Sequence, residues 1–541
     1  MWSPLLIFAI VIIASTAEWH EEFGPWVIAT KGEVWPIPKT RTVKDHFYIL
    51  RPGFTIHTVR RNCDILKDAA ERYSAIILAE ARTARQEAEG RRRKLIRNNP
   101  LCKGTLQRLE IRMHTPCNEN GQHWPSLSMN ESYALHIKES STIAVLEAPT
   151  VWGALRGLET FSQILMPSGD GPTLIVKCQT ILDEPKLPHR GLLLDTARHY
   201  FPLHDILLIL DAMSYNKLNV LHWHIVDDNS FPYQSIRYPE LSTKGSFHPS
   251  MVYTPKDVQK VVNYARLRGI RVIPEFDTPG HTKSWGESHP ELLTPCYDPA
   301  TGKPNGHLGP MNPINPKVYT FLRSLFTEIV SVFPERYIHL GGDEVRFNCW
   351  ASNPSILRYM EAHNMSHDFA TLETAFVFNL LDILNSLDAS TIVWQEVFDN
   401  GVPLPPTTAV HVWTGFWMFE LAKATKAGHP VLLSACWYLD HVAGGGDWQK
   451  FYNCDPLGFP GSTEMMDLML GGEACMWGEF VDKNNVHSRI WPRASATAER
   501  LWSWAPVDLE NASKRLEEHV CRMNRRGIPA QPPNGPGFCV T

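Results

Sequence analysis

Eight short apolar runs, each followed by polar or aromatic residues, constrain the fold of this chain more than any other feature. Helical patterns lie between several of them, for example at residues 255–268 and 315–333. Repeated strand–helix units of this length favour a parallel sheet, and eight of them predict an α/β fold with a (β/α)8 barrel. The runs are 191–194, 220–225, 271–273, 337–340, 391–394, 409–413, 430–433 and 472–476.

The part of the chain before these runs has a different character. With 541 residues the chain exceeds one ordinary domain. Residues 18–185 hold short alternating strands such as 133–137, a long polar helix over 66–97 and an amphipathic helix from residue 150. We therefore expect a smaller α+β accessory domain over 18–185, a linker over 183–188 and a catalytic barrel domain over 186–541.

The N-terminus predicts secretion. Residues 1–17 combine an apolar run with small residues before a cut after Ala17, which is typical of a signal peptide. The run is too short for a membrane anchor, and no later segment has the length of a transmembrane helix, so we expect no membrane insertion. Eleven cysteines in a secreted chain predict disulfides, with at least one thiol left free. Sequons at Asn130, Asn364 and Asn511 predict surface glycosylation.

The charge balance argues against some partners. The net charge is -5 with histidines neutral, which gives no reason to expect binding to nucleic acid or to an anionic membrane. The 23 histidines would turn the balance positive in acid, which suits an acidic compartment.

The residues after the apolar runs are those that a sugar site needs. Indole faces stack on the C–H faces of a pyranose, while acids bind hydroxyls and protonate glycosidic oxygens. A barrel enzyme places such residues at the carboxyl ends of its strands. They include Asp227 and Asp228, Glu275, Asp277 and His281, Asp343 and Glu344, Trp394, Gln395 and Glu396, Trp413, Tyr438 and Asp440, and Trp477 and Glu479.

The segment His339–Val345 is the most informative of these stretches. It places two adjacent carboxylates, Asp343 and Glu344, directly after the pair Gly341-Gly342. Glycines weaken a strand and carboxylates are seldom buried without partners, so packing alone does not explain this segment. At a barrel mouth, glycine would let a substrate approach and the two acids could divide chemical roles.

Several ordered motifs resemble those of glycoside hydrolase family 20, the β-N-acetylhexosaminidases, and are most similar to those of the animal lysosomal members. The resemblance covers nearly the whole chain and is weaker before residue 186, where residues 151–158 carry it. In the barrel it rests on residues 188–200, 222–228, 274–281, 339–345, 437–440 and 472–479.

The resemblance implies a retaining mechanism in which the substrate takes part. The enzyme would remove terminal β-linked GlcNAc or GalNAc from glycoconjugates or chitooligosaccharides. Glu344 would protonate the leaving oxygen and later activate water, while the substrate's 2-acetamido oxygen attacks the anomeric carbon. Asp343 would hold the acetamido N–H and stabilise the oxazolinium intermediate, and Tyr438 would bind the acetamido carbonyl. Adjacent acids cannot flank one glycosidic bond, which agrees with this division of roles.

The same resemblance implies roles for the other site residues. Trp394, Trp413 and Trp477 would wall the pocket. Arg190 and Glu479 would hold the ring hydroxyls O3 and O4, and Asp440 would reach O6. Asp227 and His281 would form a relay to Glu344, with Asp277 supporting that layer.

It also implies covalent and cellular features. Family disulfides would fall at Cys63–Cys117, Cys296–Cys349 and Cys521–Cys539, whereas Cys436 and Cys454 leave open an additional bridge. Cys475 is expected to be a buried free thiol. No cofactor or metal is implied. The resemblance also implies a homodimer. It implies a location in the secretory pathway, with the lysosome expected and an extracellular location as the alternative.

One position bears on substrate charge. Some animal members carry Asn-Arg after Trp-Tyr-Leu and accept sulfated sugars, whereas others carry Asp and prefer neutral ones. This chain has Asp440-His441. A carboxylate repels a sulfate, so we expect neutral substrates, with His441 partly offsetting Asp440 in acid.

Two other interpretations of the barrel remain open from the sequence. His222 and His224 alternate on one strand face, which is a common metal-ligand arrangement, and His281 and Asp277 could complete a metal-dependent hydrolase. A catalytically inactive sugar-binding protein on the same fold is the other interpretation. The intact pair Asp343-Glu344 argues against it, because a lectin needs no proton donor.

Overall fold

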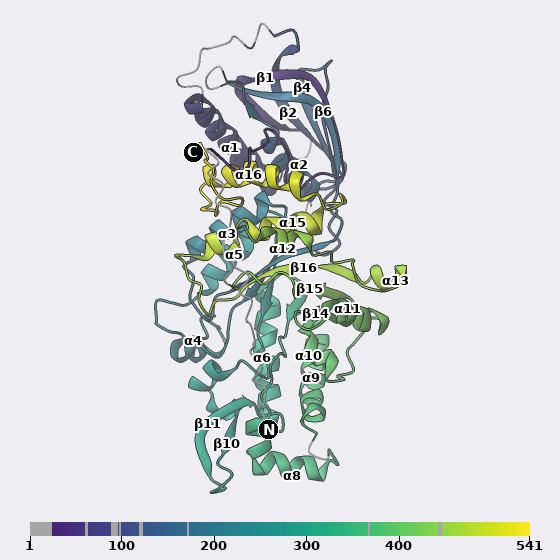
Figure 1. Cartoon of the computed structure of the whole chain (residues 1–541). Helices are drawn as coiled ribbons and strands as arrows, with labels where there is room; N and C mark the ends of the chain where they lie inside the picture. The colour runs from purple at the N-terminus through teal and green to yellow at the C-terminus, as the bar shows by residue number, and fades with distance from the viewer. Residues whose placement is uncertain are drawn as a thin grey trace, which may run out of the picture.

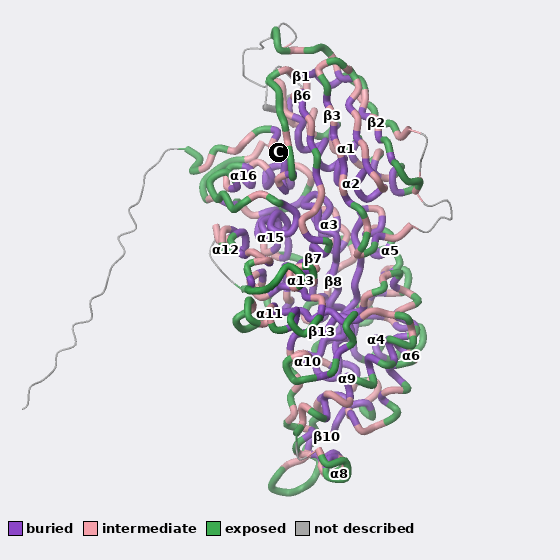
Figure 2. The backbone as a smooth tube through the Cα atoms, turned by 90° about the vertical axis from the view of Figure 1, so that its right-hand side faces the viewer, coloured by how far each residue is buried: buried purple, intermediate pink, exposed green. Residues whose placement is uncertain are grey.

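The computed structural model of the protein describes residues 24–59, 63–87, 96, 99–117, 123–169, 173–365, 368–441 and 446–540. The expected signal peptide at 1–17 lies outside these residues. The molecule is elongated, with a six-stranded sheet at one end and a closed barrel towards the other (Figure 1). Buried backbone follows the strands and the helices packed on them, and loops are exposed (Figure 2).

The N-terminal part is an α+β unit, as the sequence predicts. Its sheet has the strand order β1-β2-β4-β3-β6-β5. Two helices, α1 (Asp64–Glu87) and α2 (Val151–Gln163), pack on it (Figure 1). The strands are β1 (Thr40–Thr58), β2 (Cys102–Met113), β3 (Tyr133–Ile137), β4 (Ile143–Ala148), β5 (Met166–Pro167) and β6 (Leu174–Asp183).

The barrel closes through eight parallel strands in the order β12-β13-β14-β15-β16-β7-β8-β9. Each contains or overlaps one of the eight predicted runs, which confirms the predicted fold class. The strands are β7 (His189–Asp195), β8 (Val220–His224), β9 (Arg271–Glu275), β12 (Tyr337–His339), β13 (Ser390–Trp394), β14 (Ala409–Val412), β15 (Val431–Leu433) and β16 (Met469–Met476).

Helices cover the outside of the barrel, and α5 (Pro255–Arg266) illustrates why these segments are helical. Thr254 and Asp257 form a capping box and proline follows at the first helical position. Its buried residues Val258, Val261, Val262 and Ala265 recur at helical spacing. The other helices are α3 (Leu203–Tyr215), α4 (Glu240–Gly245), α6 (Pro316–Val332), α7 (Asn348–Ser352), α8 (Pro354–Ala362), α9 (Phe369–Ser386), α10 (Gln395–Asp399), α11 (Trp417–Lys426), α12 (Trp448–Asn453), α13 (Thr463–Met466), α14 (Val486–Ile490), α15 (Arg493–Trp502) and α16 (Leu509–Arg525).

A hairpin that the sequence analysis missed interrupts the barrel pattern. Strands β10 (Leu293–Tyr297) and β11 (Pro304–Met311) pair antiparallel between β9 and β12. The half of β11 nearest the turn is exposed and holds Gly and Asn, so it lacks the alternation that marks a strand. The disulfide Cys296–Cys349 ties β10 to α7.

The three disulfides implied by the resemblance are present, and Cys436–Cys454 forms the additional bridge. Cys475 is buried and unbridged, as expected, and the described residues include two further free cysteines, Cys102 and Cys178. All three sequon asparagines are exposed. No helix within the described residues is long and apolar enough to cross a bilayer.

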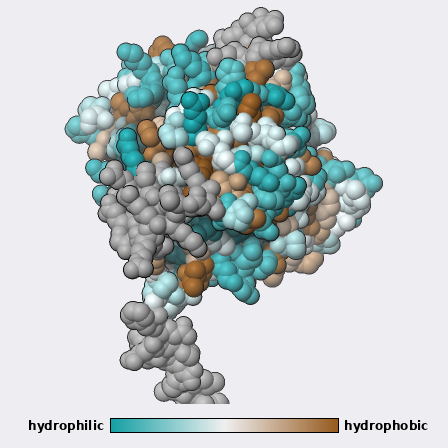
Figure 3. Space-filling model, turned by 90° about the horizontal axis from the view of Figure 1, so that it is seen from above, coloured by the Kyte–Doolittle hydropathy of each residue, from teal (hydrophilic) through white to brown (hydrophobic). Residues whose placement is uncertain are grey.

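The two parts of the chain meet through buried polar contacts. Asp183, the last residue of β6, accepts hydrogen bonds from Lys217 at 2.9 Å and from the Trp502 indole at 3.1 Å. The predicted linker over 183–188 is therefore wrong at its first residue, which is buried in this contact. Helix α16 adds to the junction, because Arg526 pairs with Glu159 of α2 at 2.9 Å. Seen from the end that carries the six-stranded sheet, the surface shows many hydrophilic residues with scattered hydrophobic groups (Figure 3).

Candidate active site

One mouth of the barrel gathers most of the predicted side chains, because parallel strands all end there. Two of them, Trp394 and Trp413, end or directly follow β13 and β14. The others lie in the loops that follow their strands: Asp227 after β8, Asp277 and His281 after β9, Asp343 and Glu344 after β12, Tyr438 and Asp440 after β15, and Trp477 and Glu479 after β16.

The turn after β12 needs both glycines. Gly341 and Gly342 have φ angles of 69° and 93°, in the left-handed region. A Cβ on Gly341 would lie 1.8 Å from Oδ1 of Asp277, and that same oxygen accepts a hydrogen bond from the Gly342 amide at 2.8 Å. Glu344 itself has φ 50°, an uncommon conformation for a non-glycine residue. The turn thus exposes the Glu344 carboxyl while Asp343 stays mostly covered.

His281 connects the expected relay. Its Nδ1 lies 3.2 Å from Oδ1 of Asp227, and its Nε2 lies 3.8 Å from Oε2 of Glu344 and 3.6 Å from Oδ2 of Asp343. Burial opposes a charge on His281, but the carboxylates of Asp277, Asp227 and Asp343 outweigh it and raise its pKa to about 11. His281 is therefore an imidazolium over the whole acid and neutral range.

Asp227 forms the charged end of this relay. Its Oδ2 lies 2.8 Å from Nε2 of His224 and 2.8 Å from the Arg198 guanidinium. Burial alone would raise the pKa of Asp227, but the hydrogen bonds from His224 and His281 and the charge of Arg198 lower it well below its ordinary value. Asp227 therefore stays ionised in acid.

Asp277 is buried beside Asp343. Burial and the neighbouring Asp343 carboxylate raise the pKa of Asp277 well above its ordinary value. Oδ1 of Asp343 is buried and accepts no hydrogen bond from any residue that the structure describes. That oxygen is available to a ligand.

Aromatic side chains wall the space next to Asp343. Trp394, Trp413, Trp477 and Tyr438 belong to one cluster around Leu193 and Cys475. Trp413 stacks on Tyr438 with ring centroids 6.1 Å apart, and Trp394 lies 6.1 Å from Trp477. Burial raises the pKa of Tyr438 well above its ordinary value, so its hydroxyl remains a hydrogen-bond donor.

The polar rim contains Glu479, Asp440 and Arg198. Arg198 lies over the Trp477 ring at 5.1 Å and pairs with Asp195 at 3.1 Å. Asp195 and Asp227, with Glu479 adding to them, raise the pKa of Arg198 against the effect of burial. Burial, with Glu479 adding to it, raises the pKa of Asp440, so Glu479 lies close enough to act on both groups. Oδ1 of Asp440 is buried and, among the described residues, has no hydrogen-bond donor. The rim therefore offers one cation and two carboxylates to ring hydroxyls.

The role expected for Arg190 is wrong, because the side chain is at the other end of the barrel. Arg190 is the second residue of β7 and is fully buried. Its guanidinium donates to both carboxylate oxygens of Glu131 at 2.7 and 2.8 Å and to the backbone oxygen of Lys217. Arg190 therefore joins the barrel to the N-terminal part and has no access to a ligand at the mouth.

Arg198 is the arginine that the sequence analysis missed. It follows the carboxyl end of β7 by three residues, whereas Arg190 lies at the amino end. The rule that barrel sites form at carboxyl ends distinguishes the two and was the signal available. Glu275 and Glu396 were noted only as members of polar tails. Each accepts a hydrogen bond from a pocket tryptophan at 2.8 Å, and no local pattern indicates that contact.

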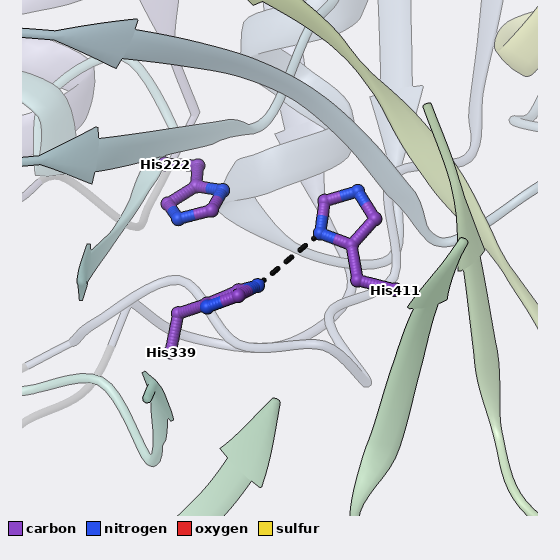
Figure 4. Close-up of side chains that lie close together, drawn as sticks. All are labelled: His222, His339 and His411. Carbon is purple, nitrogen blue, oxygen red and sulfur yellow. Dashed lines mark hydrogen bonds between the residues drawn. The ribbon is translucent and has the colours of Figure 1, made fainter. Parts of the chain in front are cut away.

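Below the pocket the barrel interior holds a polar core. His222, His339 and His411 lie close together there, all buried (Figure 4). Nε2 of His339 lies 3.3 Å from Nδ1 of His411. The two ring nitrogens of His222 face Glu473 at 2.7 Å and Glu275 at 2.9 Å.

These contacts bear on the metal-ligand interpretation of His222 and His224. Burial opposes their charge, but the surrounding carboxylates outweigh it and raise the pKa to about 9 for His222 and about 10 for His224. Each of the two rings thus lies between two carboxylates, which fits a polar barrel core.

A cavity of about 470 Å³ opens on the outer side of Glu344. The β10–β11 hairpin forms one wall through Gly306–Pro310, and Lys283 and Arg346 contribute side chains. Glu344 thus borders an open space large enough for a leaving group.

A closed (β/α)8 barrel that gathers paired carboxyl groups and a cluster of tryptophans at one mouth has the arrangement of a glycosidase. Residues 187–505 match the model described as "Glycosyl hydrolase family 20, catalytic domain", and residues 34–164 match "beta-acetyl hexosaminidase like". The chain belongs to glycosyl hydrolase family 20.

The comparisons with individual proteins agree. The chain is 48% identical to mouse β-hexosaminidase subunit beta, over 92% of this chain and 91% of the relative. It is 44% identical to mouse β-hexosaminidase subunit alpha, over 100% of this chain and 98% of the relative. A crystal structure of Flavobacterium johnsoniae chitobiase is similar with a TM-score of 0.78 and 30% identity, covering 92% of this chain and 73% of the other.

Proposed function

We propose that this protein is a retaining exo-β-N-acetylhexosaminidase that removes terminal β-linked GlcNAc or GalNAc. The observation that carries the proposal is the turn Gly341–Glu344. It directs one carboxyl group towards an open cavity and leaves its neighbour covered, beside the aromatic pocket. Family membership supports the same conclusion.

Two adjacent carboxyl groups can serve two different parts of one substrate. Glu344 donates a proton to the glycosidic oxygen, and the sugar it releases leaves through the cavity by the hairpin. The acetamido oxygen of the bound sugar attacks the anomeric carbon and forms an oxazolinium ion. Glu344 then accepts a proton from water that opens this ring, and retention of configuration follows from two displacements. Intramolecular attack benefits from effective molarities on the order of 10⁵ M or more.

The covered oxygen of Asp343 suits the acetamido N–H. It is buried, lacks a donor among the described residues and lies where a positive charge would develop. Tyr438 supports the opposite end by donating its hydroxyl to the acetamido carbonyl. Trp394, Trp413 and Trp477 enclose the sugar and exclude water.

The polar residues at the rim of the pocket bind the ring hydroxyls of the sugar. Arg198, which replaces Arg190 in this role, and Glu479 bind O3 and O4, and the unpartnered oxygen of Asp440 accepts from O6. Asp227 pairs with His281 and so keeps the positive imidazolium next to Glu344, which favours the carboxylate form of Glu344 after proton transfer.

The test compares an aryl β-N-acetylglucosaminide with the matched aryl β-glucoside at mildly acidic pH. The substrates differ only in the 2-acetamido group. Turnover of the first with almost none of the second is expected. Equal turnover of the two substrates would mean that an enzyme carboxylate, and not the acetamido group, is the nucleophile. Binding of the N-acetylglucosaminide without turnover would favour a sugar-binding protein.

The cellular setting and assembly are further proposals. The N-terminal sequence and three exposed sequon asparagines support entry to the secretory pathway and delivery to the lysosome. Tagged protein in human cells should colocalise with a lysosomal marker, and a purely extracellular pool would contradict this. We also propose a homodimer, since the curated relatives include proteins named as subunits. Light scattering on the purified protein measures its mass directly.

A further inference from the structure

Two consecutive residues of α10 hold Trp413, one through its backbone and the other through its side chain. Oε1 of Gln395 accepts the backbone amides of Trp413 and Thr414 at 3.0 and 3.1 Å. Oε2 of Glu396 accepts the Trp413 indole N–H at 2.8 Å. The amide contacts place the backbone, and the indole contact fixes how the ring is turned.

A second tryptophan, Trp394, is held in a similar way, but the carboxylate that holds it also forms ion pairs in the barrel core. Oε1 of Glu275 accepts the Trp394 indole N–H at 2.8 Å. Glu275 also pairs with His224 at 2.6 Å and with His222 at 2.9 Å in the barrel core. Among the described residues, by contrast, Glu396 has no ion-pair partner, and its carboxyl group accepts a side-chain hydrogen bond from Trp413 alone.

The charges around Glu396 explain which form it takes. Asp343 and Glu373 act on it from neighbouring elements, and Asp399 acts on it from the same helix. The nearby cation Lys423 pairs with Asp399 at 2.6 Å. Burial, supported by the charge of Asp343 and reduced by the Trp413 hydrogen bond, raises the pKa of Glu396 to about 7. In mild acid Glu396 is a neutral acid whose oxygen still accepts the indole N–H, so it adds no charge beside Asp343.

The orientation of the Trp413 indole affects the part of the site proposed to bind the acetamido group. Its ring stacks on Tyr438 with centroids 6.1 Å apart and an interplanar angle of 28°. A rotation of the indole would therefore change the wall against which an N-acyl group packs and the position of the phenol that binds its carbonyl.

We infer that Glu396 is a positioning residue of the acetamido pocket, which fixes the indole of Trp413 and so determines how closely the site fits the methyl group of an N-acetyl substituent. The inference rests on the proposed function, because it assigns the Trp413–Tyr438 wall to the N-acyl group. Glu396 touches neither the glycosidic bond nor the attacking atom.

The experiment measures kcat and KM for an aryl β-N-acetylglucosaminide and for its N-propionyl analogue. The Glu396→Ala variant should lower kcat/KM for the N-acetyl substrate by about 10-fold, the scale of one lost hydrogen bond. It should also narrow the preference for N-acetyl over N-propionyl by several-fold, because a loosened wall accepts the extra methylene. Glu396→Gln keeps an oxygen acceptor and no charge, so it should restore the wild-type preference.

Two controls separate positioning from general damage. Glu373→Gln removes a buried acid next to Glu396 that does not contact Trp413, and it should leave the acyl preference unchanged. In a Trp413→Phe background, which lacks the indole donor, Glu396→Ala should have no additional effect on that preference. An unchanged preference in folded Glu396→Ala, or an additive effect in the double variant, would overturn the inference. Loss of the proposed function would appear differently, as a wild-type enzyme that does not hydrolyse the N-acetyl substrate.

Discussion

Gly341 lies so close to Asp277 that a Cβ on the glycine would overlap the Oδ1 atom at 1.8 Å. The Gly341→Ala variant should therefore displace Asp277 and with it the turn that orients Asp343 and Glu344. We expect kcat to fall by at least about 100-fold, because misplaced catalytic groups cost that much. Gly428→Ala is the matched control, since Gly428 also has positive φ but no atom within 4 Å of the added Cβ. If both variants lose activity equally, backbone strain and not the Asp277 contact is responsible.

Glu344→Gln should remove the proton donor and leave the pocket intact. We expect kcat for a substrate with a poor leaving group to fall by about 10²–10⁴-fold, the usual contribution of general acid catalysis. An aryl leaving group of low pKa should suffer much less in the first step, because it departs without a proton. Steady-state and burst kinetics on both substrates measure the difference. An equal loss on both would contradict the acid role, and Glu291→Gln, an exposed acid, is the control.

The Arg198→Ala and Arg190→Ala variants should differ in their effect on substrate binding. Arg198→Ala should raise KM, since the guanidinium lies at the pocket rim over Trp477. It should also cost stability, because the buried carboxylates of Asp195 and Asp227 lose a partner. Arg190→Ala leaves Glu131 with one of its two arginine partners, Arg156, and should destabilise the fold by about 3–5 kcal/mol. Urea unfolding and steady-state kinetics on both variants test this. A stable Arg190→Ala enzyme with a raised KM would return Arg190 to the substrate site.

His281 should contribute stability that depends on pH. Its pKa in the folded protein is about 11, above that of an unfolded histidine near 6.5. The folded state therefore binds the proton more tightly, so the stabilisation is fully present below about pH 6.5 and falls as pH rises towards 11. The difference in unfolding free energy between wild type and His281→Asn should be constant from pH 5 to 6 and shrink from pH 7 to 10. A difference that grows with pH would show that the ring is neutral.

Asp440 should discriminate against charged sugars. Its carboxyl group lies near Glu479, and His441 offsets this only in part, so a 6-sulfated substrate would meet repulsion. We expect the wild type to prefer an aryl N-acetylglucosaminide over its 6-sulfate, and Asp440→Asn to narrow that preference by about 10-fold. The ratio of kcat/KM values measures this. Asp467→Asn is the control, and an unchanged ratio in Asp440→Asn would place O6 elsewhere.

The sequence by itself determined the strands, their order and most of the site. Short apolar runs and helical repeats are local patterns, and the residues after each run fall at one mouth because parallel strands share a direction. Asp343 and Glu344 could therefore be placed beside Trp477 and Tyr438 without coordinates. The β10–β11 hairpin could not, because its exposed half has no alternation to detect.

Contacts between distant residues were decided only by the tertiary structure. Arg190 and Arg198 stand eight positions apart in one motif, yet one binds Glu131 in the N-terminal part and the other lies over Trp477. Trp413 is oriented by Glu396 and Trp394 by Glu275, through hydrogen bonds that span 17 and 119 positions. Local propensity acts over a few residues, whereas hydrogen-bond partners and protonation depend on which groups the closed barrel brings together and removes from water.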